Sequence, residues 1–191
     1  PHSGSLQSHL LEQLYLQILD PLTSAYAERI IGNLDDNGFH VVPLSELFAA
    51  DLNPATATIG VLRVRDTIGH ALAVVRRLEP IGCAVKDFKQ SLLIQAKILF
   101  QKRKDTEPIY AYVIDILAHH FEYLEKARPY SLVRAVNDSS TVPYKLNQET
   151  AERILSIIAA LNPFPGKAFS GNQLSADYII PTAFIDQTDK E

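Results

Sequence analysis

Residues 27–40 read AERIIGNLDDNGFH, a stretch that passes from an apolar helical pattern into a polar turn. Tyr26, Ile30 and Leu34 are spaced four residues apart, which predicts one face of an α-helix. The run DDNG at residues 35–38 interrupts this pattern, because Asn and Gly tolerate the left-handed backbone that ends helices. We therefore predict that a helix runs up to Leu34 and stops at this turn.

The same turn carries half of a calcium-loop pattern. Asn33, Asp35 and Asn37 place oxygen atoms at alternate positions, and Gly38 permits a sharp bend, as the opening half of an EF-hand requires. The twelfth position of such a loop should be a bidentate Glu, and here it is Leu44. Without that carboxylate a cage binds calcium poorly, so a structural turn is the favoured interpretation.

The composition indicates an ordinary globular protein of one domain or two small ones. Of the 191 residues, 47% are hydrophobic and 21% are charged, which argues against disorder. The single cysteine, Cys83, cannot form an internal disulfide and suits a reducing compartment. No apolar run reaches the roughly 18 residues of a membrane helix, so we expect no membrane partner.

Charge is distributed unevenly along the chain. Residues 1–60 carry one basic and seven acidic side chains, residues 61–104 carry ten and three, and residues 105–191 carry seven and twelve. Such a basic band suits nucleic acid or an acidic protein surface, although a solvated helix face has the same composition. The candidate contact residues are Arg76, Arg77, Lys86, Lys89, Lys97, Lys102, Arg103 and Lys104.

Apolar spacing predicts helices almost everywhere, so we expect an all-α fold. The first predicted stripe joins Leu10, Leu14 and Ile18, and further stripes cover residues 68–78 and 109–124. These stripes are separated by short polar or Pro-containing segments, as in packed helical bundles. The expected architecture is two small helical bundles.

The polar link at residues 102–106 suggests where the two bundles divide, and a break near Gly82 is an alternative. We expect an N-terminal subdomain at residues 6–104 and a three-helix C-terminal subdomain at residues 105–170. Residues 171–191, which contain β-like runs, are expected to be a linker toward a further region of a longer protein.

The second bundle is expected to contain a hairpin similar to a helix–turn–helix. Its second helix is predicted to begin after Asn147, whose side chain suits an N-cap. A DNA-reading helix carries groups that favour phosphate near its start, but Glu149 and Glu152 stand there. We therefore favour a packed hairpin over a reader of the major groove.

Two helices are predicted to end in the same way, at LEPIG (Leu78–Gly82) and at LNPFPG (Leu161–Gly166). Proline cannot continue a helix, so Leu-x-Pro is a sharp stop, and a glycine follows each one. The repeat suggests two related helical units. The residues expected to form structural turns are Asp35, Asp36, Asn37, Gly38, Pro80, Gly82, Pro163 and Gly166.

No catalytic constellation is present. The chain has no Gly-rich phosphate loop, no G-x-S-x-G, no H-E-x-x-H and no Cys/His spacing typical of a metal site. His119 and His120 are neighbours in a predicted helix and point about 100° apart, which does not suit a shared metal. The residues therefore indicate a binding module without cofactors, not an enzyme.

Four blocks of the sequence resemble, in order and spacing, the core-binding domain of sigma-54, the bacterial sigma factor of enhancer-dependent transcription. The blocks are SLQSHLLEQL (Ser5–Leu14), AERIIGNLDDNGFH (Ala27–His40), LEPIGCAVKDFKQSLLIQ (Leu78–Gln95) and ALNPFPGKAF (Ala160–Phe169). Together they cover nearly the whole chain. The tail YIIPTAFI (Tyr178–Ile185) is similar to the segment that follows this domain in the family.

The resemblance implies a cytoplasmic bacterial module that docks on core RNA polymerase at the β and β′ subunits to form the holoenzyme for transcription initiation. It also implies contact with the factor's own N-terminal regulatory segment and, indirectly, with an ATP-dependent activator. Promoter DNA is a partner of the full-length factor, through segments that we do not find in these 191 residues. The alternative interpretation is a helical DNA-binding regulatory module.

The chain departs from the family pattern at a few positions. Cys83 and Ala84 stand where the family tends to have a small residue and Gly, and Lys86 stands where an Arg is common. Thr182 replaces an acidic residue. Lysine keeps the charge of arginine but not its two-pronged geometry, so individual polar contacts of the family are in doubt here.

Overall fold

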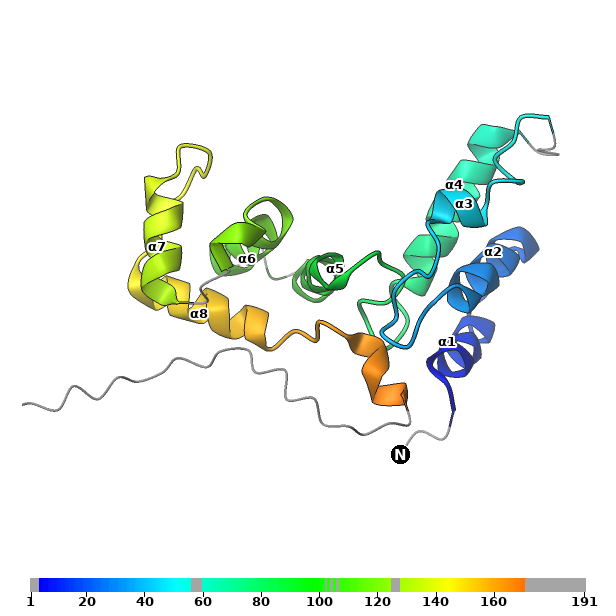
Figure 1. The fold of residues 1–191 in the computed structure, drawn as a ribbon, viewed down its shortest axis with the longest axis horizontal. Helices are drawn as coiled ribbons and strands as arrows, with labels where there is room; N and C mark the ends of the chain where they lie inside the picture. Colours follow the sequence, from blue (N-terminus) through cyan, green and yellow to red (C-terminus); the bar gives the residue numbers. More distant parts are fainter. Residues whose placement is uncertain are drawn as a thin grey trace, which may run out of the picture. The chain divides into compact units, whose positions relative to one another are not determined.

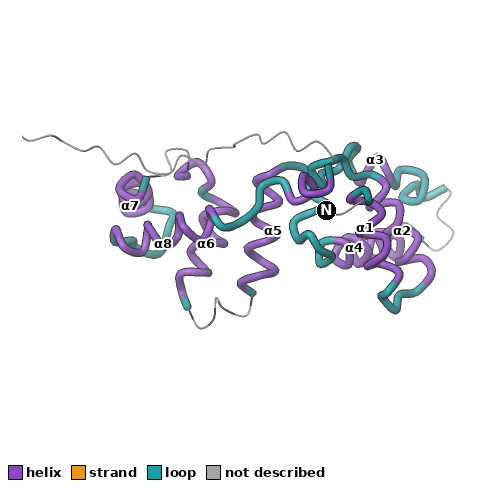
Figure 2. Tube along the Cα trace, turned by 90° about the horizontal axis from the view of Figure 1, so that it is seen from below, coloured by secondary structure: helices purple, strands orange, loops and turns teal. Residues whose placement is uncertain are grey.

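The computed structural model describes residues 4–55, 60–101, 103, 105, 107–124 and 128–170, and the following statements concern these residues. They form helices and turns without any strand, which confirms the all-α prediction (Figure 2). The segments are α1 (Leu6–Tyr15), α2 (Pro21–Gly32), α3 (Leu44–Leu47), α4 (Val61–Val75), α5 (Phe88–Phe100), α6 (Pro108–His119), η1 (Phe121–Leu124), α7 (Pro129–Asp138), α8 (Gln148–Ala159) and η2 (Pro165–Phe169).

The chain divides into two compact units, each described separately below. The first comprises the described residues of Pro1–Leu99 and of Asn162–Gln173, and the second comprises those of Phe100–Leu161. The described residues from 162 onward, which we expected in the C-terminal subdomain, thus group with the first unit. The expected linker at 171–191 lies outside the described residues.

The core of the first unit is formed by α1, α2 and α4, which lie side by side (Figure 1). Leu10 and Leu14 of α1, Ile30 of α2 and Ala71 and Val75 of α4 are almost completely buried. Helices of this length gain most of their stability from burying one apolar face, at roughly 25 cal/mol per Å² of apolar area. The packing therefore depends on the stripes that the sequence predicts.

The first predicted stripe is wrong at its last member. Helix α1 ends at Tyr15, and Ile18 is fully exposed in the segment that leads to α2. Asp20 caps α2 by accepting a hydrogen bond from the Thr23 N–H, and Pro21 occupies the first helical turn. The spacing of Leu10, Leu14 and Ile18 continues a helical period that these start signals interrupt.

The second unit contains α6, η1, α7 and α8. Its buried residues include Val113 and Ile116 of α6, Leu132 and Val136 of α7 and Ile154 of α8. The Asn147 side chain caps α8 by accepting a hydrogen bond from Thr150 N–H at 2.8 Å, as predicted. The predicted hairpin is formed by α7 and α8, which pack against each other.

A recurrent device holds segments to helices in both units. A side-chain amide pairs its oxygen and nitrogen with the backbone N–H and C=O of one distant residue, which an Asn or Gln can do because it carries both an acceptor and donors. We call this arrangement an amide clamp. The clamps among the described residues are Gln13 on Glu79, Asn33 on Val42, Gln95 on Asn162 and Asn137 on Leu146.

Candidate functional site

Three turns that are far apart in the sequence meet in the first unit. We call this meeting point the turn junction and define it as residues 35–40, 78–85 and 162–166. The Gly166 N–H donates to the Asn37 carbonyl at 3.1 Å, and the Ala84 N–H donates to the Gly38 carbonyl at 2.9 Å. The predicted structural turns thus lie against one another.

Glycines allow the close approach of backbones in the turn junction. A Cβ atom on Gly166 would lie 2.6 Å from the Asp36 carbonyl oxygen, a separation that real Cβ atoms do not show. Gly38 has φ +90°, and its Cβ would lie 2.6 Å from the Cys83 sulfur. Gly38 therefore requires glycine for both conformation and space, and Gly166 requires it for space.

The Asp35 carboxylate stabilises its own turn. One oxygen accepts hydrogen bonds from the Asn37 N–H at 2.9 Å and the Phe39 N–H at 2.8 Å, and the other accepts one from the Asn37 amide. Asp36 is exposed. This arrangement of Asp35 is that of a structural turn, in agreement with the interpretation that we favoured.

Helix α5 links two of the three turns through a buried polar network. The Ser91 hydroxyl donates to the Gly82 carbonyl at 2.9 Å, and the Gln95 amide nitrogen donates to Ser91 and to the Asn162 carbonyl. The Asn162 N–H in turn donates to the Gln95 oxygen at 3.0 Å. Pro80 and Pro163 follow the two residues held by clamps, so each Leu-x-Pro stop is fixed by a glutamine.

Cys83 is a packed residue of the turn junction. It is fully buried, and burial raises the pKa of its thiol to about 12, with a smaller contribution from the Asp35 charge. A thiol that remains protonated at neutral pH is a poor nucleophile and metal ligand.

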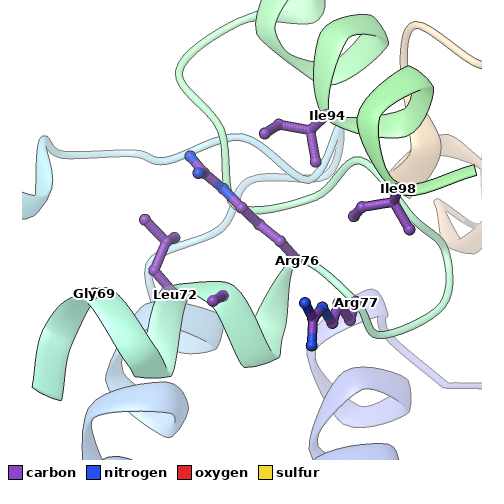
Figure 3. A pocket seen from close by; sticks show the side chains of 7 residues that line it. Gly69, Leu72, Arg76, Arg77, Ile94 and Ile98 are labelled. Atoms are coloured by element: carbon purple, nitrogen blue, oxygen red, sulfur yellow. The ribbon is translucent and has the colours of Figure 1, made fainter. Parts of the chain in front are cut away.

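A shallow hollow of about 190 Å³ lies beside the turn junction, between α4 and α5 (Figure 3). Ile94 and Ile98 of α5 face Leu72 of α4 and Arg76, the residue that follows α4, across it. We call it the α4/α5 hollow and define it by its lining residues, which are Gly69, Leu72, Ala73, Arg76, Arg77, Ile94 and Ile98.

Arg76 has both a structural and an exposed part. Its Nε donates to the Ala84 carbonyl at 3.0 Å, which ties the end of α4 to the turn junction. Burial lowers the pKa of its guanidinium, and the same positive charge, after burial itself, lowers the pKa of the neighbouring His40. The rest of the guanidinium extends over the hollow between Leu72 and Ile94 (Figure 3).

The other predicted contact residues of the first unit are all exposed. Two of them lie at or next to the hollow, and two lie near the start of α5. Arg77 lines the hollow beside Arg76, and Lys97 stands on α5 between the hollow residues Ile94 and Ile98. Lys86 lies 3.9 Å from the Asp87 carboxylate just before α5, and Lys89 is exposed in its first turn.

The remaining predicted contact residues, Lys102, Arg103 and Lys104, are not described as part of the first unit. Lys102 and Lys104 lie outside the described residues. Arg103 belongs to the second unit, where its guanidinium donates to the Tyr110 hydroxyl at 3.1 Å and stacks on the same ring.

Sequence reasoning missed the apolar part of the hollow. Ile94, Ile98 and Gly69 were not predicted as contact residues, because the prediction used the positions of basic side chains only. Ile94 and Ile98 are four residues apart and lie next to Lys97, so an apolar pair within a basic helix was the available signal.

Comparisons with known proteins agree with the blocks that converge in the turn junction. The family model described as "Sigma-54 factor, core binding domain" matches residues 1–191. The chain is similar to the RNA polymerase sigma-54 factors of Salmonella typhimurium, at 27% identity over 95% of this chain and 34% of the relative, and of Caulobacter vibrioides, at 28% identity over 96% and 31%.

A third similar protein is the RNA polymerase sigma-54 factor of Escherichia coli, at 25% identity over 95% of this chain and 34% of the relative. The chain therefore spans about a third of the length of these relatives. No described helix has the length and apolar character needed to cross a bilayer. Because the family model extends over every residue, the chain belongs to the core-binding domain family of sigma-54 factors.

Proposed function

We propose that this chain docks on core RNA polymerase and contributes to the enhancer-dependent holoenzyme during transcription initiation in the bacterial cytoplasm. The observation that carries the proposal is the match of the core-binding family model to all 191 residues. The module acts by binding and does not catalyse a reaction.

The finer assignment follows the family resemblance. We propose that the docking partners are the β and β′ subunits, and that a longer factor containing this chain also contacts promoter DNA. Its own regulatory segment would bind nearby and would respond to an ATP-dependent activator. The amide clamps and the turn junction support this role, because a docking surface requires elements that keep their relative positions.

The basic residues support binding to an acidic surface. Arg77 and Lys97 are exposed, and neither forms an ion pair with another described residue. Charges of this kind steer association and make it sensitive to salt. A module of negative net charge with a basic band would therefore approach the polymerase in one preferred orientation.

The DNA-binding alternative has less support. The exposed start of α8 carries Glu149 and Glu152, whose charges oppose phosphate at the position where a recognition helix approaches DNA. A DNA module that neutralises several phosphates would lose binding steeply as salt increases.

The test is binding of the 191-residue chain to purified core RNA polymerase without DNA, at moderate and at high salt. We expect a submicromolar Kd and competition with a full-length sigma-54 factor. Binding to short duplex DNA in the absence of binding to core would overturn the proposal and favour the DNA module.

A further inference from the structure

We infer that the α4/α5 hollow receives an apolar side chain of an acidic amphipathic helix on core RNA polymerase. The inference rests on the proposed function and assigns a part of the docking to one place in the fold. It is carried by the size, the lining and the charge of the hollow.

The size of the hollow suits one side chain and not a small-molecule ligand. Its volume is about 190 Å³. Sites for cofactors and drug-sized ligands enclose about 300 to 1,000 Å³. Apolar anchors that fill small pockets contribute much of the binding energy at protein interfaces.

The lining selects an apolar side chain. Leu72 and Ala73 of α4 and Ile94 and Ile98 of α5 form its walls, and a Cβ atom added to Gly69 would meet no atom within 4 Å. Phosphate groups of a duplex would gain nothing from such walls. Since the hollow lies between two helices, a third helix can rest in the groove and insert one residue of its apolar face.

The charge around the hollow selects an acidic partner. Arg77 and Lys97 are exposed without an ion pair among the described residues. Arg65 stands four residues before Gly69 on the same face of α4 and is also exposed without an ion pair there. Arg76 completes the rim. Carboxylates flanking the apolar anchor of the partner helix would face these cations.

Two substitutions separate the hollow from the fold. In Gly69→Leu the new side chain enters the hollow, and α4 gains a better helix former, so we expect unchanged or higher thermal stability but about tenfold weaker binding to core. The matched control is His70→Leu, which places the same side chain on an exposed α4 position outside the lining, and it should bind as the wild type does.

Charge reversal tests the rim. We expect Arg77→Glu to weaken binding by about tenfold at moderate salt. Arg63→Glu changes the net charge equally on an exposed position of α4 outside the hollow, and it should change the Kd by less than about threefold.

A photocrosslinking amino acid at Ala73 identifies the occupant. We expect a crosslink to a helical, acidic peptide of the β or β′ subunit in the presence of purified core. Wild-type binding by both Gly69→Leu and Arg77→Glu would overturn the inference while the proposed function stands. Crosslinks to duplex DNA or to a second copy of the chain, or equal losses in the control variants, would also overturn it. Failure of the wild type to bind core would overturn the proposed function itself.

Discussion

The clamps of Gln13 and Gln95 make the same hydrogen bonds in different surroundings. Gln13 of α1 holds the backbone of Glu79, with bonds of 2.5 and 2.8 Å, and Gln95 of α5 holds the backbone of Asn162, with bonds of 2.6 and 3.0 Å. Each clamped residue is the middle residue of a Leu-x-Pro stop. The two Leu-x-Pro motifs are therefore held in the folded chain by the same arrangement, a glutamine that binds the backbone of the middle residue.

Burial distinguishes the two clamps. Gln95 is 4% exposed and is connected to Ser91, which is completely buried, whereas the bonds of Gln13 lie at the surface. Water can replace the lost partner of an exposed group, but a buried group left without a partner costs roughly 1–3 kcal/mol. The comparison suggests that one bond pattern stabilises the fold strongly in one place and weakly in the other.

The largest effect is expected for Gly82→Ala. Gly82 has φ +104°, and its Cβ would lie 2.6 Å from the Gln95 amide nitrogen and 2.7 Å from the Ser91 hydroxyl. Backbone strain and overpacking together should lower the free energy of unfolding by about 4 kcal/mol. Urea unfolding measures this loss, and Gly32→Ala, where a Cβ meets nothing within 4 Å, is the control. Equal midpoints for the two variants would contradict the network.

The next effect is expected for Gln95→Leu, which removes the buried clamp and puts an apolar side chain in its place. The Asn162 N–H and C=O lose their partner, so we expect a loss of about 3 kcal/mol in the free energy of unfolding. Urea unfolding together with amide hydrogen exchange at Asn162 measures it. A loss below that of Gln13→Leu would reverse the comparison.

Gln13→Leu should have a smaller effect, because solvent can reach the Glu79 backbone after the substitution. We expect a loss of about 0.5–1 kcal/mol, the ordinary net contribution of a hydrogen bond. The same urea experiment measures it. If both glutamine variants lose equal stability, burial does not decide the strength of a clamp.

The smallest effect extends the comparison to pH. Burial, and then the charge of Arg76, lower the pKa of His40 below 6.5, so between the lowered value and 6.5 the unfolded state binds more protons than the folded state. Stability therefore rises with pH through this window and falls on acidification. Urea midpoints from about pH 7.5 to 5 should decline less in His40→Gln than in the wild type. Parallel declines would exclude His40 as the cause.

Much of the fold could be predicted because its signals are local. The Asn147 cap, the all-α class and the hairpin of α7 and α8 depend on residues within a few positions of one another. Ile18 was predicted wrongly from the same periodicity, since the Asp20 cap and Pro21 start a new helix in its place. The signals for the start of α2 therefore outweigh the apolar spacing of Leu10, Leu14 and Ile18.

The candidate site was less predictable, because its parts come from different helices. The basic band suggested Arg76, Arg77 and Lys97, yet only folding brings α4 and α5 to the two sides of the apolar hollow beside them. Arg76 also has two roles that the charge distribution along the sequence does not reveal. Its Nε donates to the Ala84 carbonyl, and the rest of its side chain lies over the hollow.

Local sequence signals were sufficient for most of the helices, for the Asn147 cap and for the membership in the sigma-54 core-binding family. Folding alone established which glutamine is buried, because Gln13 and Gln95 reach residues 66 and 67 positions away. It also brought the three turns together at Gly38 and Gly166 and placed Gly82 against Ser91 and Gln95 of α5. The physical reason is that helix signals act within one or two turns of chain, whereas burial and close approach depend on residues that only folding brings together.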